Sequence, residues 1–396
     1  MDKKLERLIR ESPSAAYVLD SRVLQERIAW LKAHLPQDVA LCYAVKANTF
    51  ITAEAAPFVE RLEICSPGEA AVCQTLGVDS QKMVISGVYK TPSFIEALVA
   101  KGDFEGILTA ESTLQYGLFC RLSEQYGGAL RILLRLTNGS QFGMDEKDVE
   151  AILKEREKHP LIHIVGIQYF SGTQKTSIKK YARELHYLDE YLQKLQTAYG
   201  YTAEELEYGT GFPVDYFLGE GVEDDVLLKE FSDLLKEMTC RPKIILELGR
   251  SMAASCGTYY THIVDIKENK GISYALTDGG MHQMVYFGQF MAMKKPYLSV
   301  LGKENENAVQ DWTICGSLCT MNDIIVKQMP LPPVTVGDVL CFERTGAYCL
   351  TEGISLFLTR ELPAVYLIKA DGTLYCLRRP FETRELNGPV YEKISI

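Results

Sequence analysis

The chain has 396 residues, a near-average composition and a formal net charge of −10 at pH 7. This length accommodates one large domain and a smaller one. The acidic balance argues against nucleic acid and anionic membranes as partners, because both bind through basic patches, and no apolar run approaches the roughly 20 residues that span a bilayer.

The N-terminal sequence and the cysteines indicate the cellular compartment. Met1–Glu6 is charged and lacks the apolar core of a signal peptide. Eleven cysteines form no paired CxxC clusters, and four of those in apolar runs are expected to be reduced, buried thiols: Cys42, Cys65, Cys341 and Cys376. The six histidines form no HxxxH or HxH pattern, so no metal site is expected. We expect a cytoplasmic protein.

The chain begins with a short arm and a strand candidate at 16–20, after which Ser21 is expected to cap a helix. From Val39 onward strands and helices alternate. The strand candidates are 40–45, 61–65, 83–86, 106–109, 131–136, 164–170, 205–208 and 243–247. The helical stretches between them are 67–76, 92–100, 112–126, 147–157, 179–199 and 224–238.

Eight strands, each followed by a helix except at the end, predict a (β/α)₈ barrel. An open doubly wound sheet is the alternative, but it would normally stop at five or six strands. After Gly257 the pattern changes to β-like runs at 258–266, 272–276, 334–342, 364–368 and 373–377. We therefore expect a barrel at 22–257 and a compact all-β domain made of 1–21 plus 258–396.

Barrel enzymes carry their reactive residues at the carboxyl ends of the strands. Lys46 ends the first strand and Glu247 ends the eighth. The seventh strand is followed by the glycine-rich turn 209–211, whose N–H groups can approach an anion, and Arg250 is a candidate fork for a phosphate. An amine, a phosphate cradle and a carboxylate together suggest pyridoxal 5′-phosphate, with Lys46 forming a Schiff base and Glu247 holding the ring nitrogen protonated.

These stretches resemble the alanine-racemase-like fold type of pyridoxal-phosphate enzymes, in the decarboxylase branch that includes diaminopimelate and ornithine decarboxylases. Tyr43–Asn48 resembles the Schiff-base motif, and Glu247–Arg250 resembles the acidic-Pro-Gly-Arg motif with leucine in place of proline. Gly316–Asp323 resembles the catalytic-cysteine segment, and Gly346–Tyr348 resembles the phosphate-contacting Gly-Ala-Tyr.

The resemblance implies roles for these residues. The catalytic set is Lys46, Glu247 and Cys319, with Cys319 supplied by the other subunit of a head-to-tail homodimer to protonate the carbanion after carbon dioxide leaves. Glu63 and Asp323 orient their neighbours. The cofactor-binding set is Lys46, Phe170, Thr173, Gly209, Thr210, Gly211, Glu247, Gly249, Arg250 and Tyr348.

Departures from the family pattern bear on the substrate. Phe170 replaces a histidine that stacks on the cofactor ring, and Thr173 replaces a serine. Thr320 stands where an acidic residue recognises a distal amine, and Tyr286 lies near the position of a substrate-binding arginine. Free diaminopimelate, lysine and ornithine are therefore poor fits. The segments are more similar to decarboxylases of siderophore intermediates or of carrier-protein-bound amino acids, with Thr320, Asp323 and Tyr286 as candidate substrate residues.

Alternatives stay open at this point. An amino-acid racemase on the same scaffold would pair the ring nitrogen with arginine, which Glu247 opposes, and a non-catalytic relative need not retain Lys46 and Cys319. Considered alone, Cys319 is another buried thiol and Tyr348 is β-core. Arg135 is expected to brace carboxylates such as Glu63. The sequence predicts a pyridoxal-phosphate α-decarboxylase of an amino acid or a conjugated amino acid.

Overall fold

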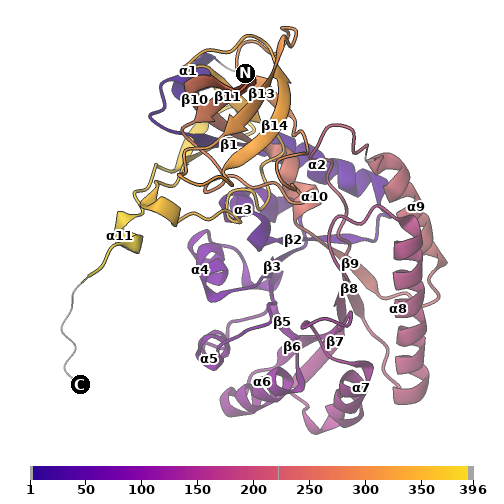
Figure 1. The fold of residues 1–396 in the computed structure, drawn as a ribbon. Helices are drawn as coiled ribbons and strands as arrows, with labels where there is room; N and C mark the ends of the chain where they lie inside the picture. The colour runs from indigo at the N-terminus through magenta and orange to yellow at the C-terminus, as the bar shows by residue number, and fades with distance from the viewer. Residues whose placement is uncertain (1–2, 222, 391–396) are drawn as a thin grey trace. The chain divides into compact units, whose positions relative to one another are not determined.

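A computed structural model describes residues 3–221 and 223–390 of the chain (Figure 1). The described residues divide into two compact units. Unit 1 contains 3–24, 215–221 and 253–390, and unit 2 contains 25–214 and 223–252.

Unit 2 is a closed barrel of eight parallel strands, with β2 paired to β9 to complete the ring. Its strands are β2 (Ala40–Ala44), β3 (Arg61–Ile64), β4 (Met83–Ile85), β5 (Ile107–Ala110), β6 (Leu130–Leu136), β7 (Ile162–Phe170), β8 (Glu205–Gly209) and β9 (Lys243–Leu248). Figure 1 shows helices outside the ring. The predicted (β/α)₈ barrel is confirmed, and each of its eight strands lies within about two residues of the predicted span.

Some of the helices begin at a polar residue that caps the first turn. Ser66 and Ser112 accept N–H groups from the third residue of the helices that follow them, at 3.1 and 3.2 Å. The helices are α2 (Ser21–His34), α3 (Thr52–Ala55), α4 (Pro67–Thr75), α5 (Pro92–Val99), α6 (Thr113–Tyr126), α7 (Glu146–Glu155), α8 (Ile178–Tyr199), α9 (Asp224–Glu237) and α10 (Arg250–Ala253).

The expected cap of α2 is wrong by one residue. The carboxylate of Asp20, not the hydroxyl of Ser21, accepts the N–H of Arg22 at 2.8 Å. A carboxylate at this position also favours the positive end of the helix dipole.

Unit 1 is built on a mixed sheet in the order β14-β13-β11-β10-β1-β16-β17, with β15 pairing β10 and β12. Its strands are β1 (Ala16–Asp20), β10 (Gly257–Asn269), β11 (Ile272–Thr277), β12 (Leu298–Val300), β13 (Gln310–Cys315), β14 (Ile324–Leu331), β15 (Val339–Phe342), β16 (Ala364–Ile368) and β17 (Leu374–Arg378). The short helix α11 (Arg384–Asn387) lies near the end of the described chain.

One face of this sheet packs against the helix α1 (Lys3–Arg10). Leu5 and Ile9 of α1 join Val18, Val339 and Ala364 in one buried cluster. The N-terminal arm is therefore helical and belongs to the core of unit 1, which its charged sequence did not indicate.

Other expectations for unit 1 need correction. The strands β13 and β14 were not predicted, and only 339–342 of the predicted strand 334–342 is extended. Cys376 is exposed, contrary to expectation, because β17 is an edge strand with a largely exposed face. All eleven cysteines are free, and of the other three that were expected to be buried, Cys42 and Cys341 are buried whereas Cys65 is only half-buried.

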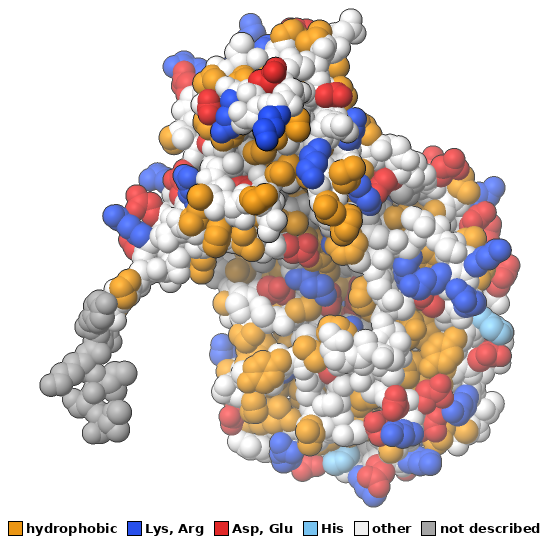
Figure 2. Space-filling view, viewed as in Figure 1, with side chains coloured by type: hydrophobic (Ala, Val, Ile, Leu, Met, Phe, Trp, Pro, Cys, Tyr) orange, Lys and Arg blue, Asp and Glu red, His pale blue; other side chains and the backbone are white. Residues whose placement is uncertain are grey.

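Charged side chains of both signs are mixed with apolar ones over the visible face of the molecule (Figure 2). Among the described residues, no helix is both long and apolar enough to cross a bilayer.

Candidate active site

The amine of Lys46 lies at the carboxyl edge of the barrel, in the short 3₁₀ turn η1 (Val45–Ala47) that follows β2. Its Nζ donates to both carboxylate oxygens of Glu63 on β3, at 2.9 and 2.8 Å, and lies 3.4 Å from Sγ of Cys65. The turn is fixed locally, because the hydroxyl of Tyr43 donates to the carbonyl of Asn48 at 2.8 Å. The lysine expected to react is thus held by a carboxylate on the neighbouring strand.

The two partners of this pair differ in exposure. The side chain of Lys46 is 42% exposed, and that of Glu63 is 4% exposed. Burial alone would raise the pKa of Glu63, but the charge and hydrogen bonds of Lys46 outweigh burial and hold this pKa below its usual range. Glu63 is therefore a carboxylate at neutral pH, and the amine reaches solvent from a fixed position.

Glu247 lies on β9, which is the other neighbour of β2 in the ring, and Cys42 is its partner in register. Burial raises the pKa of Glu247 well above its usual range, and the nearby carboxylates of Glu63 and Glu207 raise it further. The Glu247 carboxyl group therefore loses its proton less readily than an ordinary glutamate.

Gln168 on β7 holds that carboxyl group. Its side-chain Nε2 donates to Oε1 of Glu247, and the residue is 1% exposed. Gln168 lies within the predicted strand 164–170, and no role was predicted for it. The available signal was a polar side chain in the apolar part of a barrel strand, 164–170, since such a group needs a buried partner.

The turn after β8 admits only glycine at two of its three positions. A Cβ on Gly209 would overlap the ring of Phe170, its partner in register on β7. A Cβ on Gly211 would overlap the carbonyl oxygen of Gly172, and Gly211 also has a φ of +61°. The turn is therefore packed tightly on the loop that follows β7, with the buried Thr210 between the two glycines.

Hydrogen bonds join these two loops. The backbone N–H of Lys175 donates to the carbonyl of Gly211 at 2.9 Å. The side-chain amide of Gln174 accepts from the N–H of Val214 at 2.6 Å and donates to the Val214 carbonyl at 2.9 Å. The segment that contains Thr173 is thus fixed relative to the glycine turn.

A buried ion pair between Lys175 and Glu184 stabilises both loops. Nζ of Lys175, with a side chain only 1% exposed, lies 2.8 Å from Oε2 of Glu184 and 3.1 Å from both Ser171 Oγ and Tyr208 OH. Burial lowers the pKa of Lys175, while its bond to Glu184 opposes that effect. Sequence reasoning missed this network, because its members are spread over three elements with no spacing that links them.

Gly249 and Arg250 follow β9, and Arg250 opens α10 with its side chain buried. Since β7, β8 and β9 are consecutive in the ring, Thr173, the glycine turn and Arg250 occupy one sector of the barrel edge. The arrangement places a buried guanidinium and close-packed backbone N–H groups at neighbouring strand ends, which suits a phosphate.

Arg135 on β6 forms its direct ion pair with Glu111 at 2.5 Å, rather than with Glu63. Glu111 also accepts the N–H of Gly143 at 3.0 Å. Arg135 thus braces Glu111, the residue that directly follows β5, and through it the loop after β6.

The predicted cysteine of unit 1 lies on a tight loop after β13. Cys319 is exposed, and the buried carboxylate of Asp323 shapes the loop by accepting N–H groups from Leu318 and Met281, both at 2.8 Å. A Cβ on Gly316 would overlap that carboxylate. Asp323 is thus occupied with backbone groups, and its place in the site is to hold the loop.

The remaining predicted residues of unit 1 have different surroundings. The hydroxyl of the buried Tyr286 donates to the carbonyl of Glu343 at 2.5 Å. Tyr348 is half-buried with a φ of +64°, a conformation that is uncommon for residues other than glycine. Thr320 is half-buried beside Cys319.

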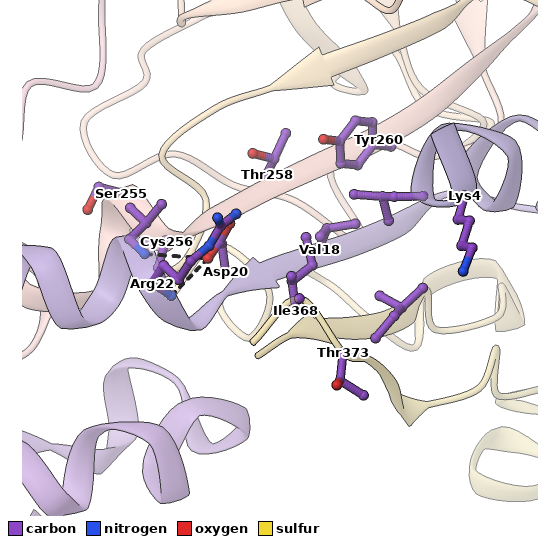
Figure 3. A pocket seen from close by; sticks show the side chains of 14 residues that line it. Lys4, Val18, Asp20, Arg22, Ser255, Cys256, Thr258, Tyr260, Ile368 and Thr373 are labelled. Carbon is purple, nitrogen blue, oxygen red and sulfur yellow. Dashed lines mark hydrogen bonds and ion pairs between the residues drawn. The ribbon is translucent and has the colours of Figure 1, made fainter. Parts of the chain in front are cut away.

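Unit 1 also contains a cavity of about 740 Å³ among β1, β10, α1 and the β16–β17 hairpin (Figure 3). Arg22 and Asp20 lie beside each other on its wall, 3.3 Å apart, and Lys4 extends from α1. None of the predicted site residues lines this cavity.

Comparison with known proteins agrees with this geometry. Residues 16–346 match the family model described as pyridoxal-dependent decarboxylase, C-terminal sheet domain. The chain is 28% identical to an L-glutamyl-[BtrI acyl-carrier protein] decarboxylase of Niallia circulans, over 80% of the chain and 79% of the relative. It is 24% identical to a 2-[(L-alanin-3-ylcarbamoyl)methyl]-2-hydroxybutanedioate decarboxylase of Staphylococcus aureus, over 90% and 94%.

The fold has a close counterpart among solved structures. Diaminopimelate decarboxylase of M. jannaschii superposes with a TM-score of 0.84 at 22% identity, covering 96% of this chain and 93% of that structure. Both the barrel and the sheet unit are therefore shared.

Proposed function

The chain belongs to the family of pyridoxal-dependent decarboxylases, and from that premise we propose that it removes the α-carboxyl group of an amino acid joined to a carrier protein or to another molecule. The observation that carries the proposal is the pairing of Lys46 with Glu63 on one side of β2 and the position of Glu247, whose pKa is raised, on the other. An amine and an acid on adjoining strands can bind the two ends of one aromatic aldehyde.

The enzyme uses pyridoxal 5′-phosphate, and the residues of unit 2 fit this group. The turn at 209–211 is a cradle that a Cβ would fill, and Arg250 adds a buried cation for the phosphate. Phe170 beside Gly209 offers an apolar face to the ring, and Lys46 offers the amine that binds the aldehyde carbon. When bound, the cofactor withdraws electrons from the α-carbon of the amino acid and so favours loss of carbon dioxide.

The protein's own groups have separate tasks in this proposal. Glu247 holds a proton on its carboxyl group for the ring nitrogen, and Gln168 orients that carboxyl group. Glu63 holds Nζ of Lys46 in position through hydrogen bonds to both of its carboxylate oxygens. The ion pair between Lys175 and Glu184 stabilises the turn at 209–211, which is proposed to bind the phosphate.

Cys319 is the proposed acid that returns a proton to the α-carbon after carbon dioxide leaves. Its thiol is exposed on a loop that Asp323 fixes, so it is accessible to a second protein surface. In a head-to-tail homodimer the acid would be Cys319 of the partner subunit. We assign cofactor binding to 22–257, this acid and the dimer contacts to 1–21 plus 258–396, and the working compartment to the cytoplasm.

The substrate class follows from the residues near Cys319 and from the relatives. The residue directly after Cys319 is Thr320, which has no charge with which to pair a distal ammonium group. Two similar proteins act on an amino acid joined to a carrier protein and on a citrate-like conjugate, as their names state. A substrate whose distal end is an amide or thioester would enter such a pocket without leaving a charge unpaired.

Release of carbon dioxide from labelled candidates tests the proposal. The panel is a glutamyl acyl-carrier protein, pantetheine-linked glutamate, and free glutamate, diaminopimelate, lysine and ornithine. We expect kcat/KM for at least one conjugate to exceed that for every free amino acid by about 100-fold or more. Equal or greater activity with free diaminopimelate, lysine or ornithine would overturn the assignment.

A further inference from the structure

The interior of the barrel contains ionised side chains, although bulky apolar side chains dominate the interior of barrels of this type. Arg61 on β3, with a side chain 6% exposed, pairs with Glu205 and Glu207 on β8 at 2.7 and 3.1 Å. Glu205 also lies 3.5 Å from Arg131. In the ring, β2 and β9 separate β3 from β8, so the contacts of Arg61 cross the interior of the barrel. A buried ion pair adds little to stability compared with apolar packing, so stability alone does not account for these pairs.

Glu207 connects this ion pair to the candidate active site. Its side chain is fully buried, and its Oε2 accepts a hydrogen bond from Arg61. Glu207 is also hydrogen-bonded to the carboxyl group of Glu247 on the neighbouring strand β9. Within the described chain, no N–H or O–H group donates to Oε1 of Glu207. Since an ionised carboxylate can only accept hydrogen bonds, the contact between the two carboxyl groups needs a proton on one of them.

The surroundings of the two carboxyl groups differ in which of them they favour as the holder of that proton. Burial raises the pKa of Glu207, and the charge and hydrogen bond of Arg61 oppose this effect. Glu247 has a hydrogen bond from the neutral amide of Gln168, and its contact with Glu207 raises its pKa further. These surroundings favour the proton on Glu247 over the proton on Glu207.

Other titratable groups face the two carboxyl groups from β2, η1 and β3. Cys42 on β2 is fully buried, and burial together with the charges of Glu207 and Glu247 raises its pKa, so it remains a neutral thiol. Lys46 is paired with Glu63, and its charge only partly offsets the effect of the carboxylates on the pKa of Glu247. Neither group therefore takes the place of Glu207 beside Glu247.

We propose that Glu207 is a positioning residue that keeps a proton on Glu247, and that Arg61 keeps Glu207 ionised for this task. The inference rests on the proposed function and extends it from the acid opposite the ring nitrogen to the two residues behind that acid. The negative charge of Glu207 raises the affinity of the Glu247 site for a proton, both in the cofactor-free protein and when the proton lies between Glu247 and the ring nitrogen. Glu207 thus acts on the reaction through Glu247.

The protonation of the ring nitrogen in the cofactor-loaded enzyme tests the proposal. It is followed by NMR against pH, with pyridoxal 5′-phosphate isotopically labelled at that nitrogen. Glu207→Gln removes the charge with little change in size, and the matched control is Glu205→Gln, because Glu205 pairs with the same Arg61 but lies at the start of β8. We expect the nitrogen in Glu207→Gln to lose its proton at a pH about one unit or more below that of the wild type, and the control to titrate as the wild type does.

A second measurement needs neither cofactor nor substrate. Glu247→Gln should raise the melting temperature of the cofactor-free protein at pH 8, because it removes a group that the folded state favours in its protonated form. This gain should be smaller in the Glu207→Gln background, where the pKa of Glu247 is raised less, and unchanged in the Glu205→Gln background.

Two results would overturn the proposal. One is a ring nitrogen that titrates as in the wild type when Glu207 is replaced. The other is an equal shift in Glu205→Gln, which would assign the effect to the buried charges as a group. Glu207→Asp retains the charge but withdraws it by one methylene group, so it should cause a smaller shift in the same direction. If Glu207→Gln does not fold, Glu207→Asp decides the question, and a wild-type titration in that variant would overturn the proposal.

The positioning role and the reaction can fail separately. If the titration shifts as expected but no conjugate releases carbon dioxide, the role of Glu207 stands and the proposed function fails. If a conjugate is decarboxylated and the titration is unchanged in Glu207→Gln, the function stands and the positioning role of Glu207 is wrong.

Discussion

Nζ of Lys46 lies 2.8 Å from Oε2 of Glu63, so that a half-exposed amine at one strand end is joined to a nearly fully buried carboxylate on the next strand. The carboxylate is the side of this pair that depends on its partner, because a buried charge without a counter-ion is costly. The ion pair fixes the position of the amine. The stability of the site therefore depends on the charge of Lys46.

We expect Lys46→Ala to destabilise the cofactor-free protein by about 2 kcal/mol at pH 8, because it leaves Glu63 charged and buried without its partner. In the variant the pKa of Glu63 loses the lowering effect of Lys46, so the loss should shrink as the pH falls and Glu63 takes up a proton. Melting temperatures measured between pH 5 and 8 check this, and Lys46→Ala with Glu63→Gln should recover most of the loss. A loss independent of pH would contradict it.

Glu247→Gln should have the opposite effect on the cofactor-free protein. The pKa of Glu247 is raised in the folded state, so the folded protein binds a proton that the unfolded chain releases, and stability falls as the pH rises through that interval. Glutamine has no proton to lose, so the variant should melt several degrees higher at pH 8 and show a flatter pH profile.

The same substitution should harm catalysis. Without an acid opposite the ring nitrogen, we expect kcat to fall by about 100-fold or more while the cofactor still binds. Turnover with a conjugated substrate and the visible absorption of the bound cofactor measure the two effects. Wild-type turnover by Glu247→Gln would remove Glu247 from the mechanism.

Two glycines with positive φ provide a matched test of the phosphate turn. A Cβ on Gly211 would overlap the carbonyl oxygen of Gly172, whereas a Cβ on Gly219 meets no atom within 4 Å. Both substitutions by alanine carry the backbone cost of about 1–2 kcal/mol. Only Gly211→Ala should also weaken binding of pyridoxal 5′-phosphate, by about tenfold or more in equilibrium dialysis. Equal affinities in the two variants would argue that the turn does not hold the phosphate.

We predict that a substitution of Cys319 lowers kcat more than a substitution of Asp323, which holds the loop of Cys319. Cys319→Ala should lower kcat by about 100-fold or more and leave cofactor absorption unchanged, because the thiol acts on the substrate alone. Asp323→Asn replaces one carboxylate oxygen by an NH₂ group that cannot accept from both Leu318 and Met281, so it should misplace the thiol and lower kcat less severely. Full activity of Cys319→Ala would refute the assignment of the acid.

The barrel could be predicted from sequence because short β-like segments alternate regularly with longer stretches whose apolar residues recur at helical spacing. The strands β13 and β14 offered no such signal. The segment Gln310–Cys315 begins with polar residues, and Ile324–Leu331 contains a lysine and a proline, so neither shows the alternation of a half-buried strand. Their pairing depends on neighbours that lie far away in the sequence.

The residues of the candidate site also fall into those that the sequence could predict and those that it could not. Lys46, Glu247 and the glycine turn follow from strand ends, where a barrel places its chemistry. Gln168, Lys175 and Glu184 could not be identified, because their roles depend on which side chain lies opposite them in space. The exposure of Cys376 has a similar origin, since an apolar strand can be at the edge or the centre of a sheet, and its sequence alone does not distinguish these positions.

The central claim is that Lys46 is the residue that bears the cofactor, and reduction with borohydride tests it most directly. The cofactor-loaded enzyme is reduced and digested, and the lysine that carries the phosphopyridoxyl group is identified by mass spectrometry. The account predicts modification at Lys46 and none in the Lys46→Ala protein. Modification at another lysine, such as the buried Lys175, or an unchanged yield of adduct in Lys46→Ala, would contradict it.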